Sequence, residues 1–377
     1  MTSAPYWPTA EGRLSGRVDL DGREMIMLSS NDYLGLAGDE KVVAGAHHAL
    51  DAYGAGIGLN PSIALTRVHR ELAEELADYL DSESVLLFNS CASANCATLQ
   101  TLADTSDALI ISDEYNHASI VDGCRLARGR TAVYRHDDLE SLRGVTADAA
   151  EAGRRLIVTD GVFSMEGSVA RLDELQPLAD SIGAHLVVDE SHAVGVVGDS
   201  GRGSVELRQS AGSTIRTGTF SKALGAGLGG FLAGPREVVD EVTSRGRFFI
   251  FTSPMPASVA GAALAAIRLV RDDLSRLEAL RSNVGRFRRG MEETGWELLD
   301  GSGPIVPVML GDDERARRVA TSLRERGVFA AAFAFPVVPR GSARIRVQIS
   351  AAHTGTDIDA AIGAFAEAAD LEAHHRS

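Results

Sequence analysis

A lysine and an aspartate each stand where a run of apolar residues ends, a place at which a sheet presents side chains to a ligand. Asp189 follows the run that begins at His185, and Lys222 follows the run at 214–220 among glycines and other small residues. A carboxylate in such a run is costly to bury unless a cation meets it, either a metal ion or a protonated pyridine nitrogen. A desolvated lysine loses its charge readily and becomes a nucleophilic amine. The alternative for Lys222, a solvated surface lysine, is disfavoured by its small neighbours.

Other polar residues follow neighbouring apolar runs. His117, Ser164 and His192 each come within a few residues of the end of such a run. The segment 89–95 consists of small residues that enter a helix, and its exposed backbone N–H groups suit a phosphate. An ordinary helix N-cap explains this segment equally well. His117 also has an alternative interpretation, as a core histidine with satisfied hydrogen bonds.

Pyridoxal phosphate (PLP) accounts for the whole set with one chemistry. PLP needs a lysine for its imine, an acid at its ring nitrogen, a flat group against the ring and donors for its phosphate. The residues that supply these groups are Lys222, Asp189, His117, Ser90, Cys91, Ala92 and Thr219. The glycines after Lys222 superficially resemble a dinucleotide fingerprint, but they follow the lysine and lack a suitable acidic residue after the next strand.

A parallel sheet is the element that would bring these residues together. Short apolar runs alternate with helical stretches at 85–88, 108–112, 132–136, 155–161, 185–191, 214–220 and 229–234. Strands that are apolar on both sides indicate a largely parallel sheet covered by helices on two faces, in an α/β protein. Ligands bind beyond the carboxyl ends of such strands, so we expect the polar residues to meet there.

The rest of the chain predicts further helices and a second, smaller domain. Apolar residues at three and four spacing predict helices at 39–54 and 69–81, and one or two long helices within 256–295. Beyond residue 295 the pattern indicates an α+β domain. Its strands are predicted at 304–311, 328–339 and 343–350, and its helices at 315–327 and from residue 355 onward.

Composition narrows the classes of function. The 377 residues carry a net charge of −15, which disfavours binding to nucleic acid and to anionic membrane surfaces. No stretch of about 18 apolar residues predicts a membrane span. The three cysteines form neither a disulfide framework nor a metal-ligand spacing, so we expect a cytoplasmic protein without a metal site.

Several long runs resemble those of the α-oxoamine synthases, PLP enzymes of fold type I with an aspartate aminotransferase-like fold. They lie at 30–36, 116–123, 159–167, 189–204 and 218–225. Within that family the sequence is most similar to 2-amino-3-ketobutyrate coenzyme A ligase, also called glycine C-acetyltransferase, and to 8-amino-7-oxononanoate synthase. The resemblance implies an N-terminal segment, 1–45, that packs with the small domain, a large PLP-binding domain at 46–260, and a C-terminal small domain at 261–377.

The resemblance also implies roles at the cofactor. Lys222 would carry the cofactor and later move the α-proton, Asp189 would pair with the ring nitrogen, and His117 would stack on the ring. His192 and Ser164 would contact the phenolic oxygen. The phosphate would be held by Thr219 together with Ser90, Cys91 and Ala92.

Further implied roles concern the substrate and a second subunit. Arg346 matches the arginine that grips the amino-acid carboxylate, although Arg344 lies two residues away on the same face of a strand and only the motif separates the two. Asn31 is a second substrate-binding candidate. Thr252 resembles the position that reaches a phosphate across a dimer interface, which implies a homodimer with shared active sites.

The implied reaction joins an amino acid to an acyl thioester, carried by coenzyme A or a carrier protein, and gives an α-amino ketone with or without loss of carboxylate. One segment departs from the family pattern: 58–69 is about one residue shorter, contains Pro61 and has no arginine at the expected place. The amino acid and the acyl chain are therefore left open. The alternatives are a PLP-dependent aminotransferase or decarboxylase, since a fold does not fix a function, and a non-catalytic PLP-binding paralogue.

Overall fold

The computed structural model describes residues 8–146, 152–209 and 214–376, and these form two compact units. The larger unit comprises the described residues within 39–164 and 168–274, and the smaller one comprises residues 8–38, 165–167 and 275–376. The boundaries expected from the sequence, after residues 45 and 260, fall within two helices that the structure assigns whole to the larger unit. These helices are α1 (Glu40–Tyr53) and α10 (Ala257–Asp272).

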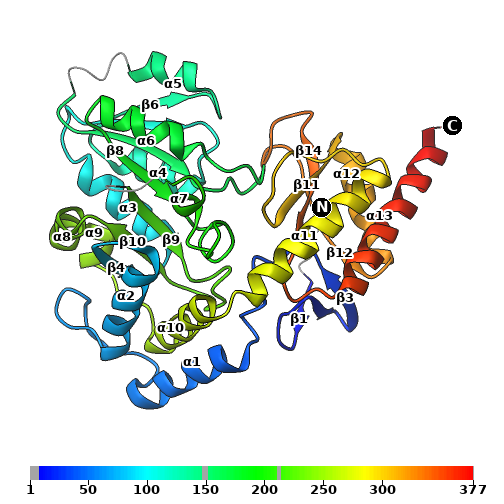
Figure 1. Cartoon of the computed structure of the whole chain (residues 1–377), viewed down its shortest axis with the longest axis horizontal. Helices are drawn as coiled ribbons and strands as arrows, with labels where there is room; N and C mark the ends of the chain where they lie inside the picture. Colours follow the sequence, from blue (N-terminus) through cyan, green and yellow to red (C-terminus); the bar gives the residue numbers. More distant parts are fainter. Residues whose placement is uncertain (1–7, 147–151, 210–213, 377) are drawn as a thin grey trace, which may run out of the picture. The chain divides into compact units, whose positions relative to one another are not determined.

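The larger unit is built on a sheet of seven strands in the order β4-β10-β9-β8-β7-β5-β6 (Figure 1). All neighbours pair in parallel except those of β10, which is antiparallel to both β4 and β9. The predicted α/β fold is confirmed. The strands are β4 (Ser84–Phe88), β5 (Leu109–Asp113), β6 (Arg130–Tyr134), β7 (Arg155–Asp160), β8 (His185–Asp189), β9 (Ile215–Thr219) and β10 (Gly230–Gly234).

Apolar side chains cover both faces of this sheet because successive residues of a strand point to opposite sides. In β7, Leu156 and Val158 belong to the core on one face, whereas Ile157 belongs to the core on the other. The helices that cover the faces are α3 (Cys91–Leu102), α4 (Ala118–Leu126), α5 (Leu139–Thr146), α6 (Leu172–Ser181), α8 (Arg236–Arg245) and α9 (Arg247–Ile250). A short helix, α7 (Ser204–Leu207), follows β8 in the chain.

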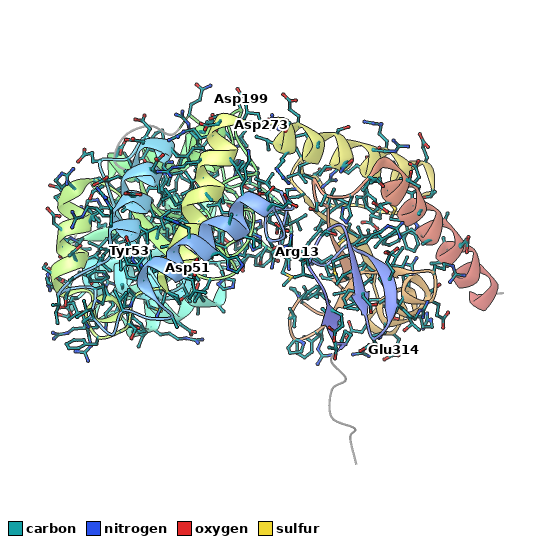
Figure 2. All side chains as sticks on the ribbon, turned by 90° about the horizontal axis from the view of Figure 1, so that it is seen from below. Arg13, Asp51, Tyr53, Asp199, Asp273 and Glu314 are labelled. Carbon is teal, nitrogen blue, oxygen red and sulfur yellow. The ribbon has the colours of Figure 1, made fainter. Side chains whose placement is uncertain are left out.

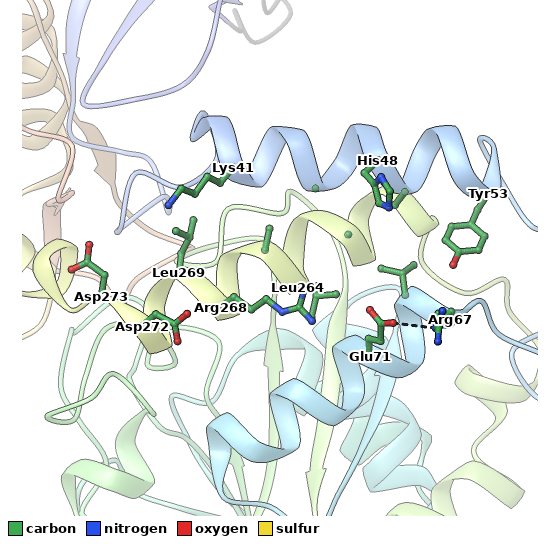
Figure 3. A pocket seen from close by; sticks show the side chains of 15 residues that line it. Lys41, His48, Tyr53, Arg67, Glu71, Leu264, Arg268, Leu269, Asp272 and Asp273 are labelled. Carbon is green, nitrogen blue, oxygen red and sulfur yellow. Dashed lines mark ion pairs between the residues drawn. The ribbon is translucent and has the colours of Figure 1, made fainter.

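Two further helices of this unit, α1 and α10, cross closely. A Cβ atom at Gly261 would lie 2.4 Å from the carbonyl oxygen of Gly45, so only glycine permits this approach. With α2 (Arg67–Leu80) these helices enclose a cavity of about 700 Å³ (Figure 3). Figure 2 labels Tyr53, the last residue of α1.

The long helical stretch predicted at 256–295 consists of two helices, α10 and α11 (Ser275–Glu293), because the chain leaves helical geometry at Asp273.

The smaller unit contains two short sheets, in the orders β1-β2-β3-β12 and β11-β14-β13. Strand β3 pairs in parallel with β12, which joins the beginning of the chain to its C-terminal part. The elements are β1 (Ala10–Glu11), β2 (Arg17–Leu20), β3 (Arg23–Met27), α11 (Ser275–Glu293), β11 (Ile305–Gly311), α12 (Asp313–Glu325), β12 (Val328–Phe329), β13 (Ala331–Phe333), β14 (Ala343–Gln348) and α13 (Gly355–Arg376).

Membrane insertion is not indicated by the helices: within the described ranges, none combines the length and the apolar character that a bilayer crossing needs.

Candidate active site

The carboxyl ends of the parallel strands bring acidic and hydroxyl side chains to one edge of the larger unit's sheet. Asp160 ends β7 and is paired in register with Asp189, which ends β8. Asp189 is in turn paired with Thr217 of β9, two residues before Thr219 ends that strand. The observed register thus brings Asp160, Asp189 and Thr217 next to one another at this edge.

Asp189 is 3% exposed, and the groups that contact its carboxylate are neutral. The backbone N–H of Ser191 donates to Oδ1 at 2.9 Å, and the Asn95 amide donates to Oδ2 at 2.7 Å. The thiol of Cys91 lies 3.5 Å from Oδ2. Among the described residues, the printed contacts of this carboxylate are neutral donors, and such a site suits a cationic partner such as a protonated ring nitrogen, since burial of an unpaired charge is costly.

Burial and the charge of Asp189 change the pKa values of two neighbouring side chains, Asp160 and Cys91. Burial, followed by the negative charge of Asp189, raises the pKa of Asp160 well above its ordinary value. The same two causes raise the pKa of the Cys91 thiol, so Cys91 remains a neutral S–H group beside Asp189. Lys222 lies close enough to oppose both shifts. The described residues contain no group of three or more His, Cys, Asp or Glu side chains arranged to hold a metal ion.

Lys222 is half-buried in the turn after β9, and its Nζ lies 3.0 Å from Nε2 of His192. His192 itself is 5% exposed and follows β8 in the chain. The predicted amine nucleophile is therefore next to a group that can accept or donate a proton. Contact between His192 and a phenolic oxygen stays a prediction.

His117 is exposed, so it is not a core histidine. It is the N-cap residue of α4, and its Nδ1 accepts a hydrogen bond from the backbone N–H of Ser119. Its own backbone N–H donates to Asp160 at 2.7 Å. This places a solvent-facing imidazole ring, anchored at its backbone, beside the strand ends.

The predicted phosphate-binding residues Ser90, Cys91 and Ala92 lie at the N-terminus of α3. Ser90 caps this helix by accepting from the N–H of Ser93 at 3.1 Å. The first helical N–H groups, those of Cys91 and Ala92, are among the donors that a helix leaves without a helical partner. A Cβ at Gly230 would lie 2.3 Å from the Cys91 nitrogen, so β10 passes this terminus where only glycine fits.

Hydroxyl groups lie at the end of β9 as well. Thr219 Oγ1 donates to the carbonyl of Gly229 at 2.9 Å and accepts from the N–H of Ser221 at 3.1 Å. The Ser221 hydroxyl lies 2.8 Å from the Thr219 hydroxyl and is on an exposed residue. The side chain of Ser221 is thus a phosphate-binding candidate that the sequence analysis left out.

Two predicted residues of the larger unit lie in loops. Ser164 is half-buried and follows β7 in the chain. Thr252 follows α9, and its hydroxyl accepts from the amide of Asn89 at 3.0 Å, next to the cap residue Ser90. Thr252 is therefore close to the α3 terminus of its own chain, whereas its contact with a second subunit stays a prediction.

Arg346 and Asn31 lie in the smaller unit. Arg346 is 7% exposed, and its Nε and Nη2 atoms are buried without a hydrogen-bond partner among the described residues. Burial lowers the pKa of Arg346, which the neighbouring Tyr33 partly opposes. By contrast, Arg344 donates to Glu166 at 3.1 Å and to the carbonyl of Met165. The structure thus distinguishes two arginines that the strand pattern alone could not, because only Arg346 retains unused buried donors.

Asn31 belongs to a polar cluster that the sequence analysis did not foresee. Its Oδ1 accepts from Gln348 Nε2 at 2.5 Å and from the Tyr33 hydroxyl at 3.2 Å. Gln348 lies two residues after Arg346, hence on the same face of β14. That spacing was the signal by which Gln348 could have been found.

The sequence of this chain is similar to a family model and to enzymes of known activity. Residues 23–365 match the family model described as aminotransferase class I and II. An 8-amino-7-oxononanoate synthase of Symbiobacterium thermophilum is 42% identical over 92% of this chain and 89% of its own length. A 2-amino-3-ketobutyrate coenzyme A ligase of Escherichia coli is 40% identical over 92% of this chain and 87% of its own.

Solved structures show the same architecture. A serine palmitoyltransferase from S. paucimobilis, solved with bound PLP and myriocin, superposes with a TM-score of 0.93 at 30% identity. The match covers 97% of this chain and 93% of that one. An 8-amino-7-oxononanoate synthase from Francisella tularensis superposes with a TM-score of 0.78 at 26% identity, covering 92% and 98% of the two chains.

Proposed function

The chain belongs to the aminotransferase class I and II family, in its α-oxoamine synthase branch, and we propose that it condenses an amino acid with an acyl thioester to an α-amino ketone. It is a PLP-dependent enzyme. The observation that carries the assignment is the buried carboxylate of Asp189, held by neutral donors at the sheet edge that also presents Lys222. Bound PLP supplies an electron-accepting ring that makes a bond at the amino acid's α-carbon easier to break.

The chain's own residues have separable tasks in this proposal. Lys222 would hold the cofactor through its amine, and the same amine would move the α-proton of the amino acid. His192, 3.0 Å from the Lys222 amine, accepts or returns a proton there. Asp189 would pair with the protonated ring nitrogen, and the N–H groups at the start of α3 would bind the phosphate. His117 would contact the cofactor ring and would donate a hydrogen bond to the thioester carbonyl as negative charge develops on its oxygen.

Thiol release tests the proposed reaction. The PLP-loaded enzyme is given trial amino acids, each combined with a panel of thioesters of coenzyme A and of a carrier protein, and free thiol is measured over time. We expect release that needs both substrates at once. Release of carbon dioxide without thiol would favour a decarboxylase, amino transfer to a keto acid would favour an aminotransferase, and a silent, spectrally unresponsive protein would favour a non-catalytic paralogue.

Arg346 is proposed to bind the amino acid's carboxylate, because its unused Nε and Nη2 donors form the planar fork that such a group accepts. Replacing Arg346 with lysine is expected to weaken amino-acid binding about 10- to 100-fold, since charged hydrogen bonds are lost. The measurement is a titration of the cofactor's absorbance with the amino acid. Arg344→Lys is the matched control, and it should lower stability through Glu166 while leaving amino-acid affinity near that of the wild type.

A homodimer with shared active sites is the assembly we propose. Its support is an apolar surface beside Thr252, where Phe251 is 74% exposed and Ile63 is 75% exposed. The amide of Asn60 donates to the carbonyl of Ile250, which ties the loop that carries Ile63 to the segment that carries Phe251. Apolar side chains this exposed in one region are typical of a protein–protein contact.

Light scattering after size exclusion tests the dimer. We expect the wild type to have twice the chain mass and the Phe251→Glu variant to shift towards the monomer, with loss of activity if sites are shared. Val133, 58% exposed on β6, provides the control, because Val133→Glu introduces the same charge elsewhere on the surface. A wild-type monomer with full activity would contradict the proposal.

The cytoplasm is the proposed compartment. Its support is the state of the three cysteines, all buried and free as thiols. Fractionation of the producing cells tests this proposal. It would be refuted if the protein were found outside the soluble cytoplasmic fraction.

A further inference from the structure

A chain of hydrogen bonds links Asp189 to the ring of His117 through two residues. Asn95 on α3 is 2% exposed, and its Nδ2 donates to Asp189 Oδ2 at 2.7 Å and to Ser119 Oγ at 2.9 Å. Its Oδ1 accepts from Thr217 Oγ1 at 2.6 Å. Ser119 Oγ in turn lies 2.8 Å from Nδ1 of His117. Every polar atom of the Asn95 side chain is thus engaged.

The direction of each bond follows from the chemistry of its ends. The Asp189 carboxylate accepts, so the nitrogen of Asn95 faces it and the amide oxygen faces Thr217. The second hydrogen of that nitrogen points to Ser119 Oγ, which therefore acts as an acceptor there. The one hydrogen of the Ser119 hydroxyl is then left to point at His117 Nδ1.

A second contact fixes the same ring nitrogen independently. The backbone N–H of Ser119 also points at His117 Nδ1, at 3.2 Å. A backbone N–H only donates, so Nδ1 is the acceptor whichever way the Ser119 hydroxyl is turned. Two donors that converge on Nδ1 leave no room for a hydrogen on it.

We infer that this network holds His117 as the neutral imidazole with its hydrogen on Nε2, and that Asn95 is the positioning residue that joins His117 to Asp189. The inference deepens the proposed function, on which its catalytic meaning rests, because Nε2 becomes the ring atom from which His117 donates. Asn95 also donates a hydrogen bond to the Asp189 carboxylate at 2.7 Å. One amide thereby links the carboxylate of Asp189 to the hydroxyl that contacts His117.

Nitrogen NMR of the PLP-loaded enzyme, labelled with ¹⁵N-histidine, tests the protonation state without turnover. The His117 resonances are identified by their loss in the His117→Gln variant. Protonated and unprotonated ring nitrogens resonate far apart, and we expect Nε2 to be protonated and Nδ1 unprotonated at neutral pH. A hydrogen on Nδ1, in either a neutral or a doubly protonated ring, would overturn the inference even if thiol release is normal.

Variants test the two links separately. Ser119→Ala removes the hydroxyl but keeps the backbone N–H, so the Nδ1 resonance should move towards that of a less hydrogen-bonded, unprotonated nitrogen while PLP affinity is retained. Asn95→Leu should weaken PLP binding about 10- to 100-fold, because a hydrogen bond to a charged group is lost, and should perturb the His117 spectrum as well.

Thr98 supplies the matched control on the same helix. It is fully buried one turn after Asn95, and its hydroxyl has no partner among the described residues, so Thr98→Val should change neither readout. An Asn95→Leu protein that loses only stability, with wild-type PLP affinity and an unchanged His117 spectrum, would show a purely structural role. If that variant does not fold, an unchanged Nδ1 resonance in Ser119→Ala still overturns the network.

Discussion

Replacing Lys222 with alanine is expected to abolish the visible absorbance band of the imine between lysine and PLP and to lower kcat on the order of 10³-fold or more. The amine both holds the cofactor and moves the α-proton, so the variant loses two functions at once. An absorbance titration with PLP and the thiol-release assay measure the two effects. Bound PLP without a covalent link is still expected, because Asp189 and the α3 terminus remain.

The composition provides an unusually clean control for this experiment. The chain contains two lysines, Lys41 and Lys222. Lys41 is exposed in the first turn of α1 and lines the cavity between α1, α2 and α10, which no strand-end residue lines (Figure 3). Lys41→Arg should therefore keep wild-type absorbance and turnover, and it leaves Lys222 as the sole lysine. A full band in Lys222→Ala would overturn the assignment.

Asp189→Asn is expected to lower kcat/KM by about 10²- to 10⁴-fold, because removal of one partner from a buried charge pair costs about 3–5 kcal/mol. The amide has nearly the same shape as the carboxylate, so the fold should be kept. Without the negative charge the ring nitrogen loses its proton and the cofactor accepts electrons poorly. Steady-state kinetics, together with PLP affinity, measure the effect.

Asp113 offers the matched comparison, since it is also a buried carboxylate at a strand end and contacts His136 at 3.1 Å. Asp113→Asn removes a carboxylate of the same kind and should lower stability while PLP affinity remains close to that of the wild type. If both variants lost activity equally, the special role of Asp189 would be refuted.

The sheet could be predicted from the sequence because its strands are short runs of consecutive apolar residues. Helices instead show apolar residues at three and four spacing. All seven predicted strands of the larger unit are present, with end points that differ by one or two residues. The same pattern places Asp189 and Lys222 at the carboxyl edge of the sheet, as expected from the rule for open sheets. The candidate site was thus located by strand ends rather than by any single residue.

Contacts between distant residues were not predictable in the same way. Asn95 lies 94 positions from Asp189 and contacts it only because α3 packs against a face of the sheet. Its position four residues after Cys91, on the same helix face, was the available signal. The difference between Arg344 and Arg346 likewise depends on Glu166, far away in the sequence. Spacing within an element can be read from a sequence, whereas partners across elements require the fold.

The central claim is that Lys222 carries the cofactor, and borohydride reduction followed by peptide mapping tests it most directly. Reduction converts the covalent link between lysine and PLP into a stable adduct, which mass spectrometry then assigns to one of the chain's two lysines. We predict a stoichiometric adduct on Lys222 and none on Lys41. An adduct on Lys41 alone, or no adduct on a protein saturated with PLP, would contradict the account.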